Sequence, residues 1–404
     1  MTEKMTAWPR KDGRKGIRNT IVVAYLVECA HHVARQIIRP FEDADVHVIG
    51  FPGCFPNDYA QNMMETLCTH PNVGAVLMVS LGCENFRKAQ LTSVIEQSGR
   101  PAELLTIQRS GGTMASVETG RAWVAQQLKS LAQQPLVEMH PSELVVGTIC
   151  GGSDATSGIT GNPAAGRAFD LLIQQGATCI FEETGELIGC EHIMAGRAAT
   201  PELAKSLIDT VQKAEQYYAH MGYGSFSQGN AEGGLSTIEE KSLGAYAKSG
   251  DSQISGIVKP CIQPPKGGLY LLDVVPDGTP IFGFPNINDN AEIIEMISCG
   301  AHAVIFVTGR GSVVGSAISP VVKVCANPET YAHMAGDMDV NAGRILSEDA
   351  SLASVGEEIF AKILGLAKGG RTASEKLGHQ EFVLTYKTFD PLGPNCLPAT
   401  QAAS

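Results

Sequence analysis

The sequence is poor in charged and aromatic residues, and it lacks both paired cysteines and long apolar runs. Charged residues make up 18% and aromatic residues 6% of its 404 positions, whereas apolar residues make up 44%. The 11 cysteines are odd in number and no two have C-x-x-C spacing, which argues against a disulfide framework and a zinc ribbon. No stretch approaches about 18 uninterrupted apolar residues and no basic start precedes an apolar run, so we expect a cytoplasmic protein without a membrane span.

The charge that is present is mainly negative. Asp and Glu number 42 against 30 Lys and Arg, which gives a formal net charge of −12. A generally acidic surface predicts that the protein binds neither nucleic acid nor an anionic membrane. A small anionic substrate remains compatible with this charge, because a local pocket of Arg and Lys can oppose the overall sign.

The length and the order of apolar segments predict an α/β protein of two domains with largely parallel sheets. Short, β-branched runs alternate with longer helical patterns, as expected for strands that are covered on both faces. The predicted strands are Thr20–Leu26, Val46–Phe51, Ala75–Leu81, Glu103–Ile107, Leu144–Ile149, Thr178–Phe181, Leu269–Val274, Ala303–Val307 and Pro320–Val324. The predicted helices are Ala30–Arg39, Asn57–Thr69, Phe86–Ser98, Thr113–Gln134, Pro163–Gln175, Pro201–His220, Thr237–Lys248, Asn290–Ser298 and Leu352–Leu366.

A polar stretch with two prolines, Gln133–Ser142, follows a long helix and precedes a new strand, and it gives the domain boundary. We predict an N-terminal α/β domain over residues 1–140, a C-terminal α/β catalytic domain over 141–388 and a partly ordered tail over 389–404. Ligands of open parallel sheets bind at the carboxyl ends of the strands. We therefore expect the active site at those strand ends, between the two domains.

Two polar segments of the first domain each have two interpretations. The basic segment Lys11–Asn19 precedes the first strand and could bind an anion, but taken alone it is better explained as a solvated run of charge. The segment Ser80–Asn85 follows a strand and places Cys83 beside Glu84. A thiol next to a carboxylate can ligate a borderline metal, although a small buried cysteine is the commoner explanation of a lone Cys.

The segment Cys150–Pro163 is the most specific. It holds four glycines between an apolar strand and an apolar helix, where a connection usually needs about two to six residues. A loop of this length with small side chains suits close approach of the backbone to a ligand. Its polar side chains are candidates for substrate contacts: Ser153, Asp154, Ser157 and Asn162.

The segment Glu182–Glu186, with Glu191 and His192 shortly after it, also follows a strand. Taken alone, the histidine would more often be structural and the carboxylates would more often be a solvated helix start. Together, four carboxylates and one histidine suffice for a divalent metal and a general base.

The glycine-rich segment Thr308–Gly315 has three interpretations. A dinucleotide loop needs a helix directly after its glycines, yet a second apolar run begins at Pro320. The alternative is a clamp on a substrate carboxylate formed by Arg310, Ser312 and Lys323. A plain glycine-rich turn competes with both.

At these residues the sequence resembles the altronate/galactarate dehydratase family of sugar-acid dehydratases. The motifs that carry the resemblance occur in family order: Gly13–Asn19, Gly82–Glu84, Cys150–Pro163, Glu183–His192, Gly233–Gly244 and Thr308–Gly315. The resemblance implies a hydro-lyase that removes the C2 proton and the C3 hydroxyl of a sugar acid to give a 2-keto-3-deoxy acid. It also implies a divalent metal cofactor, Fe(II) or Mn(II).

Removal of a proton next to a carboxylate builds an enediolate, whose charge a metal and fixed cations must absorb. The catalytic candidates are Glu183, Glu186, Glu191 and His192. The metal-ligand candidates are His192, Glu183, Cys83 and Glu84. The substrate-binding candidates are Arg18, Asn19, Ser153, Asp154, Ser157, Asn162, Arg310, Ser312 and Lys323. The spacing leaves open which carboxylate is the base and which is a ligand.

The resemblance also bears on partners. Family members often carry an N-terminal SAF domain, a small β-rich module that we do not find here, so a separate SAF-domain small subunit is a candidate partner. We also expect a homo-oligomer. The large subunit of sulfolactate sulfo-lyase resembles the same scaffold and ranks second. A non-catalytic binding protein and an NAD-dependent oxidoreductase that uses the glycines of 309–315 rank below both.

Overall fold

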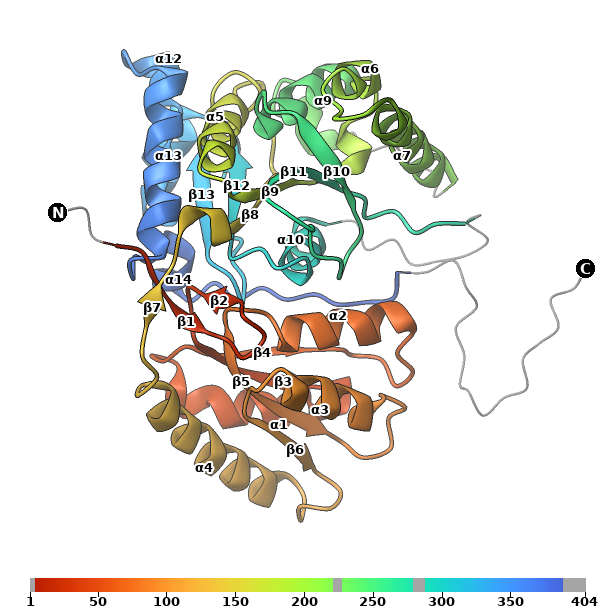
Figure 1. Cartoon of the computed structure of the whole chain (residues 1–404), viewed down its shortest axis with the longest axis vertical. Coiled ribbons are helices and arrows are strands. Elements are labelled where there is room, and N and C mark those ends of the chain that lie inside the picture. The colour runs from red at the N-terminus through yellow and green to blue at the C-terminus, as the bar shows by residue number, and fades with distance from the viewer. Residues whose placement is uncertain (1–3, 221–226, 279–287, 388–404) are drawn as a thin grey trace, which may run out of the picture.

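A computed structural model describes residues 4–220, 227–278 and 288–387 of the chain. The predicted tail over residues 389–404 lies outside these ranges. Two parallel sheets dominate the described part, and they lie one above the other in Figure 1. The predicted α/β class with largely parallel sheets is therefore confirmed.

The first sheet has four parallel strands in the order β4-β3-β5-β6. Its strands are β3 (Thr20–Tyr25), β4 (Val46–Gly50), β5 (Val73–Ser80) and β6 (Ala102–Thr106). Its helices are α1 (Glu28–Ile38), α2 (Asp58–Cys68), α3 (Lys88–Gln97) and α4 (Thr113–Leu131). Buried residues of α1 and α4 pack on one face of the sheet, and those of α2 and α3 pack on the other.

The second sheet has seven parallel strands in the order β10-β11-β9-β8-β12-β13-β14. The strands are β8 (Val145–Cys150), β9 (Thr178–Phe181), β10 (Ile254–Val258), β11 (Gly268–Leu272), β12 (Ala303–Thr308), β13 (Val321–Cys325) and β14 (Val340–Asn341). The main covering helices are α5 (Gly161–Gln174) and α13 (Leu352–Leu366) on one face and α10 (Asp289–Ser298) on the other. The chain leaves β8 for β9 on one side and returns with β12 on the other, so the strand order reverses at β8.

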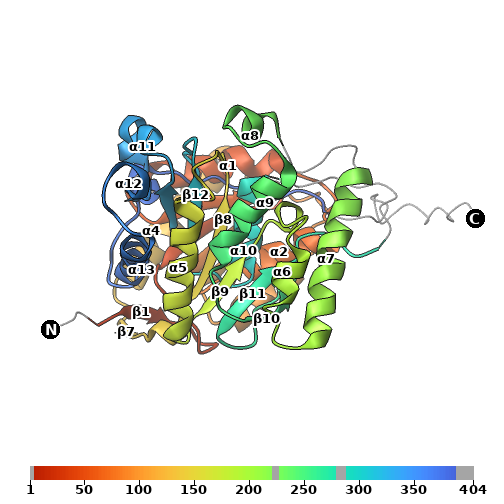
Figure 2. The ribbon, with the colours of Figure 1, turned by 90° about the horizontal axis from the view of Figure 1, so that it is seen from above.

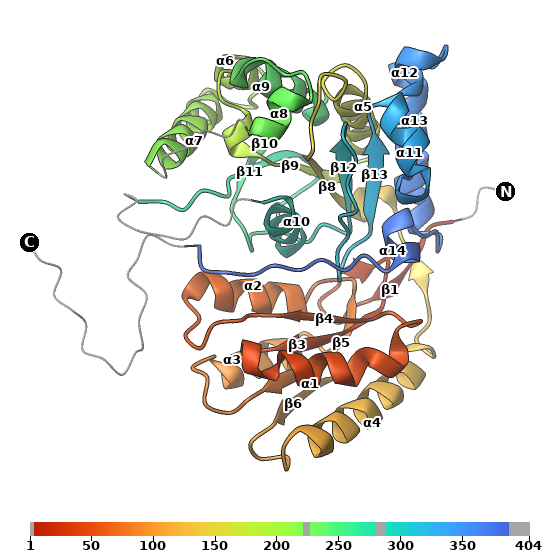
Figure 3. The same cartoon turned by 180° about the vertical axis from the view of Figure 1, so that it is seen from behind.

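One core joins the two sheets. Buried residues of α2 and α10 belong to the same cluster as inward-facing residues of both sheets, and the two helices lie between the sheets in Figures 1 and 3. The segment after α14 (Ala373–Leu377) also passes between them, where Leu384 is buried and Lys387 forms an ion pair with Glu295 of α10. One face of each sheet is thereby covered by a shared layer of helices and chain.

A small antiparallel sheet completes the strands. It pairs β1 (Thr6–Pro9) with β2 (Lys15–Gly16) and β7 (Val137–Glu138), on either side of the first sheet in the sequence. These strands have two to four residues and no apolar run, so composition did not reveal them. All nine predicted strands and all nine predicted helices are present.

The remaining helices lie mainly around the carboxyl ends of the second sheet. They are α6 (Glu191–Ala195), α7 (Pro201–His220), α8 (Gln228–Glu232), α9 (Ile238–Tyr246), α11 (Pro328–Met334) and α12 (Arg344–Ser347). Figure 2 shows α8 and α9 beside the ends of β8 and β12. Among the described helices, none combines the length and apolar character that crossing a bilayer requires.

Candidate active site

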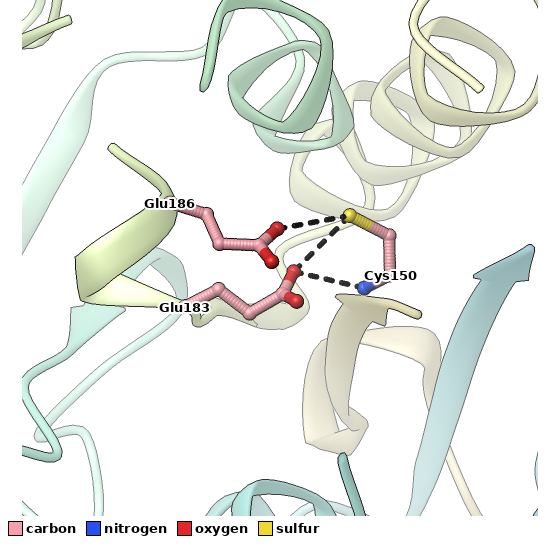
Figure 4. Close-up of side chains that lie close together, drawn as sticks. All are labelled: Cys150, Glu183 and Glu186. Atoms are coloured by element: carbon pink, nitrogen blue, oxygen red, sulfur yellow. Dashed lines mark hydrogen bonds between the residues drawn. The ribbon is translucent and has the colours of Figure 1, made fainter. Parts of the chain in front are cut away.

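Three side chains with metal-ligand atoms converge at the carboxyl ends of β8 and β9 (Figure 4). The Cys150 thiol lies 3.2 Å from Glu183 Oε2 and 3.6 Å from Glu186 Oε2. The backbone N–H of Cys150 also donates to Glu183 Oε2, at 2.9 Å. We call Cys150, Glu183 and Glu186 the ligand triad. Among the described residues it is the sole group of three or more such side chains whose ligand atoms all lie within 4.8 Å.

The local backbone explains how the triad forms. Cys150 is the last residue of β8, and β9, its parallel neighbour, ends at Phe181. Glu183 has a φ of 86°, in the left-handed region that non-glycine residues rarely adopt. This turn directs Glu183 back toward β8 and begins the short 3₁₀ helix Thr184–Glu186, which carries Glu186. Strain of this kind persists where the surroundings fix it, which is typical of functional sites.

Two lysines neutralise the triad carboxylates. Lys248 pairs with Glu183 and lies 3.5 Å from the Cys150 sulfur, whereas Lys241 pairs with Glu186. Lys248 is fully buried and Lys241 nearly so. Both lysines come from α9 and the 3₁₀ turn Ala247–Ser249 that follows it. Buried charges of this kind need partners, so these ion pairs hold α9 against the ends of β8 and β9.

Further carboxylates surround the triad. Glu182 is fully buried and neither of its oxygens has a hydrogen-bond partner within the described residues. Burial and the neighbouring Glu183 raise the pKa of Glu182 to about 8. Burial, followed by the charge of Glu183, raises the pKa of Asp289 to about 6, and burial also raises that of Glu292. Burial and mutual repulsion thus favour the protonated forms of these three carboxyl groups, and a cation bound nearby would favour their ionised forms.

This donor set fits a divalent transition metal. The triad offers one sulfur and two carboxylates, a mixture that suits borderline metals better than Mg²⁺ or Ca²⁺. Burial and Glu183 raise the pKa of the Cys150 thiol to about 11, so a metal would have to displace its proton. The oxygens of Glu182 lack hydrogen-bond partners among the described residues, but they do not belong to the triad.

A pocket of about 250 Å³ opens beside the triad. Its wall contains all four polar residues predicted from the loop, Ser153, Asp154, Ser157 and Asn162. Lys241 lies in the same wall, so its ammonium group connects the pocket with Glu186. The pocket stands at β8, where the strand order reverses, which is the usual ligand position in an open parallel sheet.

Within the pocket wall, Asp154 organises the loop. Its Oδ1 accepts hydrogen bonds from the backbone N–H groups of Thr156 (2.9 Å) and Ser157 (3.2 Å), and its Oδ2 accepts one from Asn327 (2.9 Å). The Oδ1 of Asn162, by contrast, is buried and has no hydrogen-bond partner within the described residues. Asp154 therefore shapes the loop, and Asn162 has an acceptor left for a ligand.

The backbone of α9 touches the loop directly. A Cβ added to Gly158 would lie 2.6 Å from the Cα of Gly244, and one added to Gly244 would lie 3.0 Å from the Cα of Gly158. Two apolar side chains of the pocket wall, Ile159 and Leu243, are more than half exposed. The glycine-to-glycine contact thus forms one side of the pocket, and exposed apolar side chains line its wall.

The loop after β12 supports the pocket from the other side. The backbone N–H groups of Gly309 (3.2 Å) and Arg310 (2.8 Å) donate to the carbonyl of Gly152. A Cβ on Gly309 would lie 2.1 Å from Asp154 Oδ1, so this position needs glycine. Residues 309–320 contain no helix, which removes the support for a dinucleotide loop.

Comparison with known proteins decides the family. Residues 141–389 match the family model for the C-terminal part of D-galactarate/altronate dehydratase, and residues 7–132 match that for the second domain of D-galactarate dehydratase/altronate hydrolase. The chain belongs to the galactarate/altronate dehydratase family. The two matched ranges contain the second and the first parallel sheet, respectively.

Relatives of several activities share this scaffold. The chain is 32% identical to the (2R)-sulfolactate sulfo-lyase subunit beta of Chromohalobacter salexigens, over 93% of this chain and 95% of the relative. It is 30% identical to the altronate dehydratase of Bacillus subtilis, over 93% of this chain and 76% of the relative. It is 33% identical to the galactarate dehydratase (L-threo-forming) of Escherichia coli, over 78% of this chain and 60% of the relative.

Not every predicted site residue of this family member lies at the triad. Arg18 is buried in an ion pair with Glu375 at 2.6 Å, and Asn19 accepts a hydrogen bond from Arg10 at 2.9 Å. Both therefore hold the N-terminal segment in place. Lys323 is fully buried in β13, where its ammonium group lies 3.2 Å from His379 Nδ1.

Two residues of the predicted carboxylate clamp lie in the loop after β12. The Arg310 guanidinium is exposed and donates to the carbonyl of Gly229, at 2.7 Å, at the start of α8. Ser312 Oγ accepts a hydrogen bond from the backbone of Val314, at 3.2 Å. Neither residue, nor Lys323, contributes to the wall of the pocket.

Three of the four predicted metal ligands also lie outside the triad. Cys83 is exposed at the end of β5 in the first sheet, and Glu84 accepts hydrogen bonds from Ser80 Oγ (2.5 Å) and from the N–H of Gly82 (2.9 Å). His192 is exposed on α6, directly after the half-buried Glu191. Glu183 is the predicted ligand that the triad contains.

Sequence reasoning gave no role to Cys150, Lys241 or Lys248. Cys150 was visible as the first residue of the predicted loop, and Lys241 as part of the motif Gly233–Gly244. The ion pairs join residues 55 and 65 positions apart, so no local pattern linked the lysines to the glutamates. Apolar context around Lys248 was the available sign that this lysine is buried.

Proposed function

We propose that the protein is a lyase of the hydro-lyase type, which removes water from a sugar acid or a related 2-hydroxy acid. The observation that carries the proposal is the ligand triad beside a pocket lined by the polar loop of residues 153–162. A divalent metal bound by the triad, Fe(II) or Mn(II), would polarise the substrate and stabilise negative charge on its carboxylate side. Membership of a family whose relatives include two named dehydratases supports the reaction class.

The residues of the pocket divide the work of such a reaction. Asn162 binds a substrate hydroxyl through its unpartnered oxygen, and the 153–157 loop presents its backbone and small side chains to the remaining hydroxyls. Glu186 is the more exposed triad carboxylate, at 17% against 4% for Glu183. Glu186, which pairs with Lys241 of the pocket wall, is therefore assigned the C2 proton, whereas Glu183 fixes the Cys150 backbone and sulfur. Loss of the C3 hydroxyl leaves an enol, which becomes the 2-keto acid.

Two catalytic candidates outside the triad, Glu191 and His192, keep a smaller part in the proposed reaction. Glu191 and His192 stand on α6, which follows in sequence the 3₁₀ helix that carries Glu186. We keep them as candidates for acid–base work at the rim. Exchange of His192 for alanine should lower turnover if this holds, and unchanged turnover and metal content would remove His192 from the site.

A second candidate reaction is elimination of sulfite from a sulfonated 2-hydroxy acid. The chain spans 95% of the sulfo-lyase subunit beta but 76% of the altronate dehydratase from Bacillus subtilis. The chemistry at C2 is the same, and a C–S bond at C3 breaks instead of a C–O bond. The word "subunit" in the name of that relative also supports a separate small partner chain for this protein.

One assay tests the proposal. The purified chain, loaded anaerobically with Fe(II) or Mn(II), is given a panel of sugar acids and sulfolactate, with and without a SAF-domain partner. We expect a 2-keto acid from at least one substrate, with sulfite released as well if the second reaction applies. Absence of a 2-keto acid with every substrate, metal and partner would overturn the lyase assignment.

A further inference from the structure

The two buried lysines differ in their access to the pocket. Lys241 lines the pocket and pairs with Glu186, the more exposed carboxylate of the triad. Lys248 pairs with Glu183 and does not contribute to the pocket wall. Among the described residues of that wall, Lys241 is the sole one with a positive charge. An anionic substrate in the pocket therefore meets the Lys241 ammonium group first.

The carboxylates that hold the lysines are the ones that a metal would use. Glu183 Oε2 accepts hydrogen bonds from the Cys150 N–H, the Cys150 thiol and Lys248. Glu186 accepts from the Cys150 thiol on Oε2 and from Lys241 on Oε1. A cation bound by the triad competes with both ammonium groups for the negative charge of these two carboxylates. Each displaced ammonium group loses a buried ion pair, which is costly unless another anion replaces the carboxylate.

We propose that Lys241 exchanges Glu186 for the carboxylate of the hydroxy-acid substrate when a divalent metal binds the triad. Lys248, which the pocket does not reach, keeps its place beside Glu183 and Cys150 and limits how tightly a metal binds. This inference rests on the proposed function, because it assumes a metal at the triad and an acid in the pocket. It assigns a residue that binds the substrate carboxylate, and it links the binding of the metal to the binding of the substrate.

The exchange makes the two ligands cooperative. Without an acid in the pocket, the metal must displace Lys241 from Glu186, and the Lys241 ammonium group loses that ion pair. With an acid present, the displaced ammonium group gains a new carboxylate, so the metal binds more tightly. Linkage requires the reverse effect as well, so that metal strengthens binding of the acid by the same factor.

Calorimetry with Mn(II) as the probe tests the exchange directly. Lactate serves as the acid, because it has a 2-hydroxy carboxylate but no leaving group at C3. In the unaltered chain, saturating lactate should raise Mn(II) affinity on the order of 10-fold. In Lys241→Met, Mn(II) should bind more tightly than in the unaltered chain without lactate, and lactate should change the affinity by less than about 2-fold. Lys241→Arg, which keeps the charge, should restore most of the lactate effect.

Matched variants separate this inference from a general effect of charge. Lys248→Met should raise Mn(II) affinity and retain the lactate effect. Lys248→Gln, which keeps a polar end, is measured beside it in case Lys248→Met does not fold. Lys213→Met is the control, because Lys213 forms an ion pair with Asp273 at 2.5 Å outside the pocket wall. It should behave as the unaltered chain does.

The outcomes distinguish failure of the lysine exchange from failure of the metal site. A full lactate effect in Lys241→Met, or Mn(II) affinity that falls in Lys241→Met, overturns the exchange and leaves the lyase proposal intact. Failure of the folded, unaltered chain to bind Mn(II) or Fe(II) at all overturns the metal site, and the exchange with it.

Discussion

Two strand ends in this molecule carry the same three kinds of side chain and use them differently. At the end of β8 and β9, Cys150, Glu183 and Lys248 meet from separate elements and are buried. At the end of β5, Cys83, Glu84 and Lys88 come from one loop and the helix start after it, and Cys83 is exposed.

The difference lies in where the carboxylate finds its partners. Burial alone would raise the pKa of Glu84, but hydrogen bonds from Ser80 and from Gly82 outweigh burial and lower it. Glu84 is thus satisfied by its own loop. At the triad, Glu183 has partners on β8 and on the turn after α9, and Glu182 beside it has none within the described residues. At the triad, long-range convergence thus brings the ligand atoms together, whereas the β5 loop satisfies its own carboxylate.

The largest contrast should appear when each glutamate is changed to glutamine. Glu183→Gln removes a triad charge and should weaken Mn(II) binding and turnover by on the order of 100-fold or more. Glu84→Gln should leave both within about 2-fold, because its contacts are local. Calorimetry and a 2-keto acid assay measure the two effects. Equal losses in the two variants would contradict the separate roles of the two strand ends.

The opposite edge of the second sheet sharpens the comparison through pH. His302 precedes β12, where its Nδ1 accepts from the N–H of Val145 at 3.0 Å, and burial lowers its pKa to about 4. A histidine with a folded pKa below its unfolded value of about 6.5 takes up a proton mainly on unfolding, so acid destabilises the fold between these two values. Between pH 7 and pH 5 the free energy of unfolding should fall by about 2 kcal/mol through this group.

Urea unfolding at several pH values measures this fall. His302→Gln should show a shallower dependence on pH over the same window, although it is less stable at pH 7. The control is His31→Gln, because His31 is half-buried and pairs with Glu28 on the surface. Identical pH slopes for the unaltered chain and His302→Gln would show that another group causes the fall.

The two thiols should differ in reactivity. Burial and Glu183 raise the pKa of Cys150 to about 11, so it is a protonated, enclosed thiol near neutral pH. Cys83 is exposed. Iodoacetamide at pH 8 should therefore modify Cys83 at least about 10-fold faster than Cys150, as followed by peptide mass spectrometry. Faster modification of Cys150 would mean that its sulfur is more accessible than this packing allows.

The smallest contrast concerns stability at the β5 end. Glu84→Gln weakens the hydrogen bond from Ser80 and the ion pair with Lys88 at 3.2 Å. The free energy of unfolding should fall by about 1 kcal/mol, as measured by urea denaturation. Ser80→Ala is the matched variant, and it should cost a similar amount because it removes the same hydrogen bond. A cost several times larger would show that Glu84 supports more than its own loop.

The sequence predicted the fold well, because buried strands and amphipathic helices each leave a repeating apolar pattern. It also predicted the loop of residues 153–162, whose unusual length and small side chains are local features. It predicted Glu183 and Glu186 but not the lysines opposite them, because those ion pairs join distant positions. Adjacent Cys83 and Glu84 matched a ligand pattern, yet adjacency let Glu84 bond to its own loop. Arg18 and Lys323 illustrate the same limit, since charge alone did not distinguish a structural cation from one at the pocket.

The contact between Gly158 and Gly244 bears on how the pocket can change. Because backbone meets backbone there, even one added methyl group would push α9 away and carry Lys241 with it. The width of the pocket is therefore a fixed dimension, and acceptance of longer or shorter acids has to be altered elsewhere. Ile159 and Leu243 are exposed in the pocket wall, so under the proposed function we expect mutant libraries at these two positions to change chain-length preference.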